Sequence, residues 1–492
     1  MWARLNGCVI WRSGFEVLES MGQEIPSSQF TEEDFAEFTR RLEVETELLA
    51  QWFEEGMFSQ QGSRCGMELE ACLLYNNGDP APRNQLFMEQ FDEPLVVPEL
   101  ATFNLELNSR VRPLQGDVFR HMAQELTDLW GRCNQRADDM GLRMGMIGVL
   151  PTLQQSSLSL ANMSPLNRYR ALNEQIFRLR NGQSVRLHIE GRESLHLEHE
   201  DVMLESAATS FQIHLQVDIA QAATLYNLSK IVSAPMVAVS ANSPYLFGRD
   251  LWDETRIPLF EQAISVGASD LTKRVSFGIR YVYTSMMENF TANLLRYPVL
   301  LPLLMDEPAD KLAHLRLHNG TIWRWNRPLI GFDEKGVPHL RIEHRVQPAG
   351  PSIVDSIANS AFYFGLVIGL LEQVKDPTER LHFDHARDNF YTAAREGLAA
   401  EVVWFDEQRV ALDLLVTDQL LPIARAGLAR LTVDADEIDH WLGIIEQRVV
   451  KHQTGAAWQR AWIGRHGREF HGLMQEYLAH QESGRAVHEW PV

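Results

Sequence analysis

Four short segments of this sequence place acidic or imidazole side chains at alternating positions. They are Gly66-Met67-Glu68-Leu69-Glu70, Asn104-Leu105-Glu106-Leu107-Asn108, Gln212-Ile213-His214-Leu215-Gln216 and Arg341-Ile342-Glu343-His344-Arg345. Alternation of polar with apolar residues predicts β-strands, in which successive side chains point to opposite faces. Glu68 and Glu70 then lie on one face, about 6.5 to 7 Å apart along the strand. A sheet of these strands would carry four carboxylates, one imidazole and two arginines on its polar face.

Carboxylates at this density repel one another unless cations lie between them. Mg²⁺ takes oxygen ligands, and two or three such ions can bridge phosphate oxygens and neutralise developing charge. The alternative is a one-sided antiparallel sheet whose solvent face is polar, although such faces favour Thr, Lys and Ser. Recurrence in four segments favours a metal-dependent enzyme. Its expected metal ligands are Glu68, Glu70, Glu106, His214 and Glu343.

Two arginines share the predicted face of Glu343. Arg341 and Arg345 lie two residues before and after it, so all three side chains point the same way. Guanidinium groups bind phosphate or carboxylate oxygens through paired hydrogen bonds, and the alternative is a local ion pair that neutralises Glu343. We favour the functional interpretation and assign Arg341, Glu343 and Arg345 to catalysis. Since the sequence contains no glycine-rich phosphate loop, bound ATP would be held by metals and arginines.

Bulk composition excludes several classes of partner. The chain has 492 residues and a formal net charge of −21, so it lacks the basic excess of a general nucleic-acid or anionic-membrane binder. Its four cysteines contain no CxxC pair and are too few for a disulfide framework, which favours the cytoplasm. The uncharged stretch 356–371 is too short and too polar for a membrane span, so we expect a buried helix behind the sheet.

The order of the predicted elements favours an α+β fold with a largely antiparallel sheet, backed by helices. Thr31-Glu32-Glu33-Asp34 resembles a capping box before a helix that reaches residue 53. Further predictions are a helix over 117–140, a strand over 146–149, an exposed hairpin within 182–200 and a helix over 226–239. We expect residues 1–20 to be a disordered or mis-annotated extension and 21–354 to form the catalytic domain. Residues 355–492 would form an almost wholly helical part packed on it.

With these strands in view, the sequence resembles the glutamate-cysteine ligase type 2 family and its carboxylate-amine ligase relatives in the glutamine-synthetase-like superfamily. The segments that carry the resemblance follow one another in the family's order. They are Gly66-Met67-Glu68-Leu69-Glu70, Asn104-Leu105-Glu106, Ser210-Phe211-Gln212-Ile213-His214, Ser240-Ala241-Asn242-Ser243-Pro244, Gly320-Thr321-Ile322-Trp323 and Arg341-Ile342-Glu343-His344-Arg345. Their order, more than any single segment, makes the resemblance specific.

The resemblance implies ATP held by two or three Mg²⁺ ions, or by Mn²⁺ in their place. Glu70 and Glu106 would bind one ion, and Glu68, His214 and Glu343 the others. A glutamine-synthetase-like sheet would present these ligands from its polar face.

The same resemblance implies contacts with the nucleotide and the substrate. Arg345 would face the transferred phosphoryl group, and Glu68, Glu70 and Arg345 together would hold ATP. Arg256 looks similar to the arginine that receives the carboxylate of the amino-acid substrate. Asn242, in the loop before it, is expected to contact the same substrate.

The implied reaction activates a carboxylate as an acyl phosphate, which an amine then attacks. We expect glutamate and cysteine as substrates and γ-glutamylcysteine, a precursor in glutathione biosynthesis, as product. The alternatives are another amine acceptor, a metal-dependent hydrolase or a silent nucleotide-binding homologue. The charged segment 182–200 looks longer than a minimal connection, and this departure leaves the choice of amine open.

Overall fold

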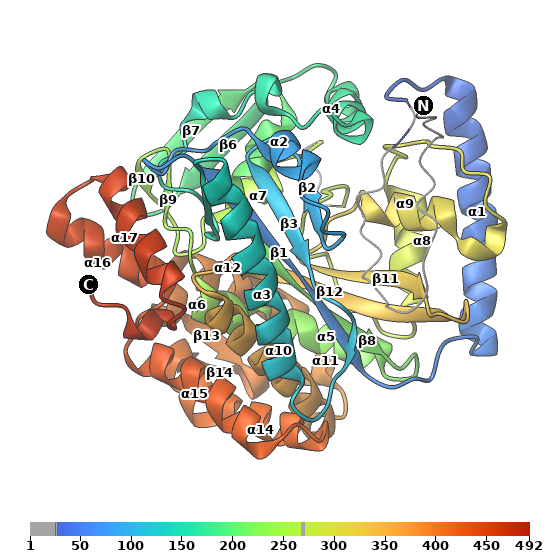
Figure 1. Ribbon diagram of the computed structural model, residues 1–492. Helices are drawn as coiled ribbons and strands as arrows, with labels where there is room; N and C mark the ends of the chain where they lie inside the picture. Colours follow the sequence, from blue (N-terminus) through green and yellow to red (C-terminus); the bar gives the residue numbers. More distant parts are fainter. Residues whose placement is uncertain (1–24, 26, 267–270) are drawn as a thin grey trace.

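An antiparallel sheet of eight strands runs through the middle of the computed structural model, which describes residues 25, 27–266 and 271–492 (Figure 1). The main path of the sheet is β11-β12-β8-β1-β3-β2, and β4 and β5 also pair with β1. The strands are β1 Arg64–Leu74, β2 Val96–Pro98, β3 Asn104–Asn108, β4 Arg112–Pro113, β5 Arg143–Gly145, β8 Ser210–Val217, β11 Asn326–Phe332 and β12 Pro338–Pro348. The predicted extension over residues 1–20 lies outside the described residues.

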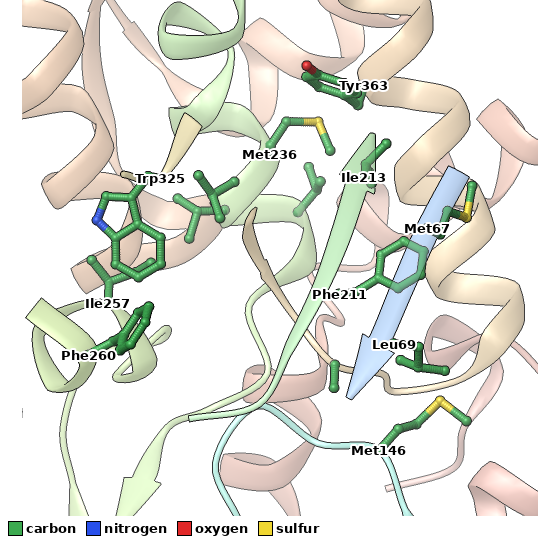
Figure 2. Close-up of a cluster of buried hydrophobic side chains, with 14 of the residues drawn as sticks. Met67, Leu69, Met146, Phe211, Ile213, Met236, Ile257, Phe260, Trp325 and Tyr363 are labelled. Atoms are coloured by element: carbon green, nitrogen blue, oxygen red, sulfur yellow. The ribbon is translucent and has the colours of Figure 1, made fainter. Parts of the chain in front are cut away.

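Alternation along the strands separates an apolar face from a polar one, as the sequence predicts. Met67, Leu69, Phe211 and Ile213 point to the apolar face, where Figure 2 shows them with Tyr363. The large apolar side chains are fully buried there, which is the main source of stability for such a layer. The polar residues of the same strands are therefore held on the opposite face by the burial of their neighbours.

In the described part of the chain, nine α-helices come before β1 or between later strands of the sheet. They are α1 Glu32–Glu55, α2 Asn84–Glu89, α3 Val118–Asp139, α4 Asn167–Leu179, α5 Ala222–Ile231, α6 Ser233–Ser240, α7 Arg256–Ala263, α8 Met287–Arg296 and α9 Ala313–Gly320. Helix α1 begins with the predicted capping box, in which Thr31 and Asp34 bond each other's backbone N–H. The helix predicted over 226–239 is instead two helices, α5 and α6.

One local prediction fails because tertiary contacts override the apolar pattern. The strand expected over 146–149 is replaced by β5, which ends at Gly145 and whose Met144 pairs with Leu73 of β1. The N–H and C=O of Met146 bond the Gln481 side chain of the C-terminal part instead of a neighbouring strand. The apolar residues after Gly145 are thus buried without being a strand.

A long apolar helix lies behind the sheet and starts the C-terminal part. Among the described residues, α10 Ile353–Gln373 has the length and composition of a membrane span. However, 94% of its most apolar 18-residue segment is buried inside the protein. The hydroxyl of Ser360 lies 3.6 Å from the sulfur of Met67 on β1. This placement confirms the helix expected behind the sheet.

The remaining C-terminal helices follow α10, and two of them pack against it (Figure 1). They are α11 Pro377–Arg380, α12 Phe383–Glu396, α13 Leu412–Leu415, α14 Leu421–Arg430, α15 Ala435–Val450, α16 Gly455–His466 and α17 Phe470–Glu482. This part is not wholly helical, because β13 Glu401–Trp404 and β14 Gln408–Ala411 form a hairpin. The Asn389 side chain of α12 donates to the Val403 carbonyl at 2.6 Å and accepts from the Val403 N–H at 2.9 Å, so α12 holds β13 in place.

Two further hairpins lie outside the main sheet. They are β6 Val185–Glu190 with β7 Ser194–His199, and β9 Tyr245–Leu246 with β10 Arg249–Asp250. The first confirms the exposed hairpin expected within 182–200. The observed architecture confirms the predicted α+β class with a largely antiparallel sheet and covering helices.

Candidate active site

The carboxylates of β1 and β3 lie side by side on adjacent strands. Glu70 lies directly opposite Glu106, and Glu68 lies opposite Asn108. Directly opposed side chains in an antiparallel pair have Cβ atoms about 5 Å apart. The amide of Asn108 donates to the Glu106 carboxylate at 3.0 Å. Strand register therefore gathers three of the predicted ligands.

The neighbouring strands bring His214 and Glu343 to the same place. His214 of β8 pairs with Glu343 of β12, and the His214 Nε2 lies 3.1 Å from an Oε1 of Glu68. Ligand atoms of these three residues all lie within 4.8 Å of one another. This spacing suits a shared cation.

His214 carries the clearest sign of a missing partner. Its side chain is 2% exposed, its Nδ1 has no hydrogen-bond partner among the described residues, and the 3.1 Å contact of its Nε2 with Glu68 lacks hydrogen-bond geometry. A buried polar nitrogen without a partner is costly, and neutral imidazole is a common metal ligand. The residues present thus fit a divalent cation at Glu68, His214 and Glu343.

Glu343 is held ionised by an arginine that the sequence analysis missed. Arg327 of β11 lies opposite it and donates two hydrogen bonds, at 2.9 and 2.7 Å. Burial acts to raise the pKa of Glu343, but Arg327 and then Arg345 outweigh it and lower that pKa to about 2. The carboxylate is therefore a charged ligand at any physiological pH. Only the pairing of β11 with β12 reveals the role of Arg327.

Glu70 and Glu106 resist ionisation in the absence of cations. Burial, followed by the charge of Glu99, raises the pKa of Glu70 to about 7, although Ser210 donates to it from its N–H and its hydroxyl. Burial and the charges of Glu68 and Glu99 raise the pKa of Glu106 well above its usual value. Such crowding is relieved when metal ions enter.

Two acidic residues of this group lie outside the predicted strands. Glu99 follows β2, and Glu205 lies on a short 3₁₀ helix, Val202–Ala207. Burial, with Glu99 and Glu70 nearby, raises the pKa of Glu205 to about 8. Neither residue has a periodic sequence signal, since each comes from an irregular connection and is placed by the fold.

A cavity of about 290 Å³ adjoins these groups; His214 and Glu343 are buried and are not among the described residues that line it. Its polar end is lined by Glu68, Glu70, Glu99, Glu106, Glu205, Arg168, Ser210, Gln212 and Arg345. Its apolar end is lined by Leu301, Leu303, Met305, Leu315, Leu317, Trp323, Leu329 and Ile330. The cavity therefore joins a site for cations and anions to a wall suited to a planar or aliphatic group.

Both predicted catalytic arginines line this cavity and carry free donors. Arg341 is 8% exposed and Arg345 is 7% exposed. In the part of the chain that the structure describes, the Nε of Arg341 and the Nη1 of Arg345 have no hydrogen-bond partner. Gln212 fixes Arg345 by accepting from its Nη2 at 2.8 Å. These donors are available to an anionic ligand.

The predicted substrate residues are placed differently. Arg256 lines the cavity, but Glu254 accepts from its Nε at 3.2 Å and β12 carbonyls accept from its Nη2. Asn242 is fully buried and is not among the described residues that line the cavity. Its amide nitrogen donates to the Ala349 carbonyl at 2.8 Å and to the Tyr477 hydroxyl at 2.9 Å. Asn242 therefore joins the residue after β12 to the C-terminal part, and its expected substrate contact stays a prediction.

A second group of possible ligands lies on the exposed β6–β7 hairpin. His188 and His196 are cross-strand partners, and Glu190 Oε1 lies 2.7 and 3.0 Å from their Nε2 atoms. His199 instead bonds Asp201 at 2.8 Å. This group lies outside the cavity and does not contribute to it.

Comparisons with known proteins agree with this site. The model of the glutamate-cysteine ligase family 2 matches residues 64–483. No curated protein matches the chain significantly. The fold is similar to that of a glutamate-cysteine ligase from Francisella tularensis, solved in complex with AMP, with a TM-score of 0.51 and 13% identity over 88% of this chain and 91% of that one.

A weaker similarity links the chain to a bifunctional glutathione synthetase from Pasteurella multocida, with a TM-score of 0.46 and 11% identity over 89% of this chain and 55% of that one. The fold comparison rests on the Francisella protein. The family match covers most of the chain and contains all five predicted metal ligands. The chain therefore belongs to glutamate-cysteine ligase family 2, a family of carboxylate-amine ligases.

Proposed function

We propose that this protein is an ATP- and Mg²⁺-dependent ligase that joins the γ-carboxylate of glutamate to cysteine. The proposal rests on one arrangement. Glu68, which shares a possible metal site with the buried His214 and Glu343, lines the same cavity as Arg341 and Arg345, and each arginine has a donor without a described partner. Membership of glutamate-cysteine ligase family 2 supports the reaction class. The three cysteines of the described residues are buried and unpaired, which supports a cytoplasmic location.

Metal binding follows from the two sets of ligands. Glu68, His214 and Glu343 would hold one ion, and Glu70 with Glu106 another, because these pairs are opposed across the strands. Mg²⁺, or Mn²⁺ in its place, supplies charge neutralisation for phosphate oxygens. Burial and neighbouring carboxylates raise the pKa values of Glu70 and Glu106, and the relief of this repulsion by a cation supports the second site.

The cavity can receive ATP along its length. The apolar wall near Trp323 and Leu315 suits the adenine base, and the polar end suits the phosphates with their metal ions. The AMP bound to the Francisella ligase supports this assignment. In the absence of a glycine-rich loop, arginines supply the hydrogen-bond donors.

The reaction divides into two displacements. An oxygen of the glutamate γ-carboxylate attacks the γ-phosphorus of ATP, and ADP leaves; the amine of cysteine then attacks the acyl carbon, and phosphate leaves with the release of one proton. Arg345 and Arg341 lie where they can stabilise negative charge on the phosphoryl group and on the leaving phosphate. Catalysis is thus mainly positioning and electrostatic stabilisation.

An assay of the whole chain tests the proposal. The purified protein is incubated with ATP, Mg²⁺, glutamate and a panel of amines, while phosphate release and amide formation are followed together. We expect an amide with cysteine, formed in equal amount to phosphate. Product with another amine would replace cysteine as the acceptor. Phosphate release that no amine and no amino acid stimulates would overturn the ligase assignment and favour a hydrolase.

A further inference from the structure

A second cavity, of about 40 Å³, lies on the other side of residues 321–325. Trp323 lines the active cavity, whereas the next residue, Arg324, lines the second one. The other walls come from α5, α8 and residues 278–282. Since a cavity needs about 10 to 15 Å³ to hold one water molecule, this one has room for about three waters and excludes a nucleotide.

The floor of this cavity contains a buried cation without a counterion. Arg324 is 6% exposed, and in the described part of the chain it forms no salt bridge and its Nη1 has no hydrogen-bond partner. The guanidinium lies over the Tyr297 ring at 5.4 Å. The hydroxyl of Tyr281, which is 1% exposed and lines the same cavity, also has no described partner. Two buried donors thus lack an acceptor.

A lysine adds a second buried positive charge. Lys230 is 1% exposed, and its Nζ donates to the Phe277 carbonyl at 2.5 Å. The same nitrogen lies 5.0 Å from the centroid of the Tyr226 ring. Burial, and then repulsion by Arg324, lowers the pKa of Lys230 to about 7. Arg324 is therefore close enough to disfavour the charged form of Lys230.

The mouth of the cavity is also basic. Arg280 and Arg296 line it and are exposed. Among the described lining residues Glu288 is the one carboxylate, and it is paired with Arg280. Four cationic side chains therefore surround a small volume in a protein whose net charge is −21. Random surface composition would favour the opposite sign.

We propose that this cavity binds a compact oxyanion of the phosphate or sulfate type. Arg324 and Tyr281 would donate to its oxygens, and Lys230, with Arg296 at the mouth, would balance its charge. Ordered water could satisfy the orphan donors, but it would leave the buried positive charges uncompensated, which is the larger cost. The site is separate from the active cavity and does not depend on the proposed reaction.

Titration calorimetry of the full chain with inorganic phosphate tests the site, in a low-salt buffer without nucleotide or metal. We expect saturable binding of one anion per chain at the second cavity, with sulfate competing and with acetate and chloride much weaker. Arg296→Gln should weaken phosphate binding about tenfold, because it removes a charged donor at an exposed position that the fold does not need. Arg409→Gln, on an exposed strand outside both cavities, is the matched control and should bind as the wild type does.

Two further variants separate the cavities. Arg324→Gln should abolish the binding, and Arg341→Gln, which removes a donor of the active cavity, should leave it intact. Should Arg324→Gln fail to fold, Arg296→Gln still tests the site. The proposal is overturned if phosphate shows no saturable binding, or if binding survives in Arg324→Gln and Arg296→Gln and is lost in Arg341→Gln.

Discussion

Two buried arginine–carboxylate pairs in this protein have the same chemistry and different surroundings. Arg327 holds Glu343 at 2.7 Å in the active cavity, and Arg448 of α15 holds Asp355 of α10 at 2.7 Å in the C-terminal part. Both carboxylates are fully buried. The difference lies in what surrounds each pair.

The Asp355 carboxylate accepts hydrogen bonds from several groups around it. The Ser352 hydroxyl and the Val487 N–H also donate to Asp355, and Arg448 donates to the Asn359 side chain as well. The Glu343 pair instead adjoins groups whose hydrogen-bonding capacity is unused, such as both nitrogens of His214 and the Nη1 of Arg345. The Nε of Arg448 also has no described hydrogen-bond partner, so the pairs differ mainly in their setting. Arg327 lines the active cavity, whereas neither Asp355 nor Arg448 is among the described residues that line either cavity.

The largest effect is expected when the Arg327–Glu343 pair is broken. Glu343→Gln keeps the volume of the side chain and removes a charged metal ligand, so we expect kcat of amide formation to fall about 10³-fold or more. Arg327 would remain among other acidic groups, so the unfolding midpoint should move little. Circular dichroism and turnover measured on one preparation check both points, and full activity in this variant would disprove the metal assignment.

The corresponding change in the structural pair should act on stability. Asp355→Asn leaves Arg448 buried without an anion, so we expect a loss of about 3 to 5 kcal/mol in the free energy of unfolding. Urea denaturation measures this loss. The folded fraction at low temperature should keep its kcat, and a selective loss of kcat with wild-type stability would place Asp355 in the catalytic machinery.

Addition of Mg²⁺ should distinguish the predicted metal site from the rest of the protein without a measurement of turnover. Mg²⁺ at about 100 times its Kd should stabilise the wild type by about 2.7 kcal/mol, because only the folded chain assembles the ligands. His214→Ala should lose most of the corresponding rise in thermal midpoint. His121→Gln alters an exposed histidine on α3 and should respond to Mg²⁺ as the wild type does. An equal response in all three proteins would refute the predicted ligands.

The smallest effect concerns pH. Because the pKa of Glu70 is raised to about 7 in the folded, metal-free chain, the folded state binds more protons than the unfolded state between about pH 4.3 and 7. Its contribution to stability is therefore present at low pH and is lost as pH rises through about 7. Glu70→Gln removes this titration, so the wild type should lose more stability than the variant from pH 5 to pH 8 in EDTA.

Added Mg²⁺ favours the ionised carboxylate and should reduce that difference between the wild type and Glu70→Gln. Equal pH dependence of the two proteins in EDTA would show that Glu70 does not titrate in this range. Denaturation at several pH values, with and without metal, makes the measurement.

The predictable part of the fold and site came from local periodicity. Alternation in β1, β3, β8 and β12 correctly placed Glu68, His214 and Glu343 on one face, since side-chain direction in a strand depends on neighbouring residues alone. The α1 capping box was equally local. The strand expected over 146–149 shows the limit, because its apolar residues are buried by the C-terminal part instead of by a sheet.

The local sequence pattern thus specified the polar stripe and the family to which its ordered motifs point, and it predicts the metal ligands. The tertiary structure decided which distant groups complete it: Arg327 through strand pairing, Glu99 and Glu205 through irregular connections, and Arg324 through the turn that separates the two cavities. It also placed Asn242 between the end of β12 and the C-terminal part. The physical reason is that backbone geometry sets direction over a few residues, whereas proximity between distant residues depends on strand order and on the packing of the whole chain.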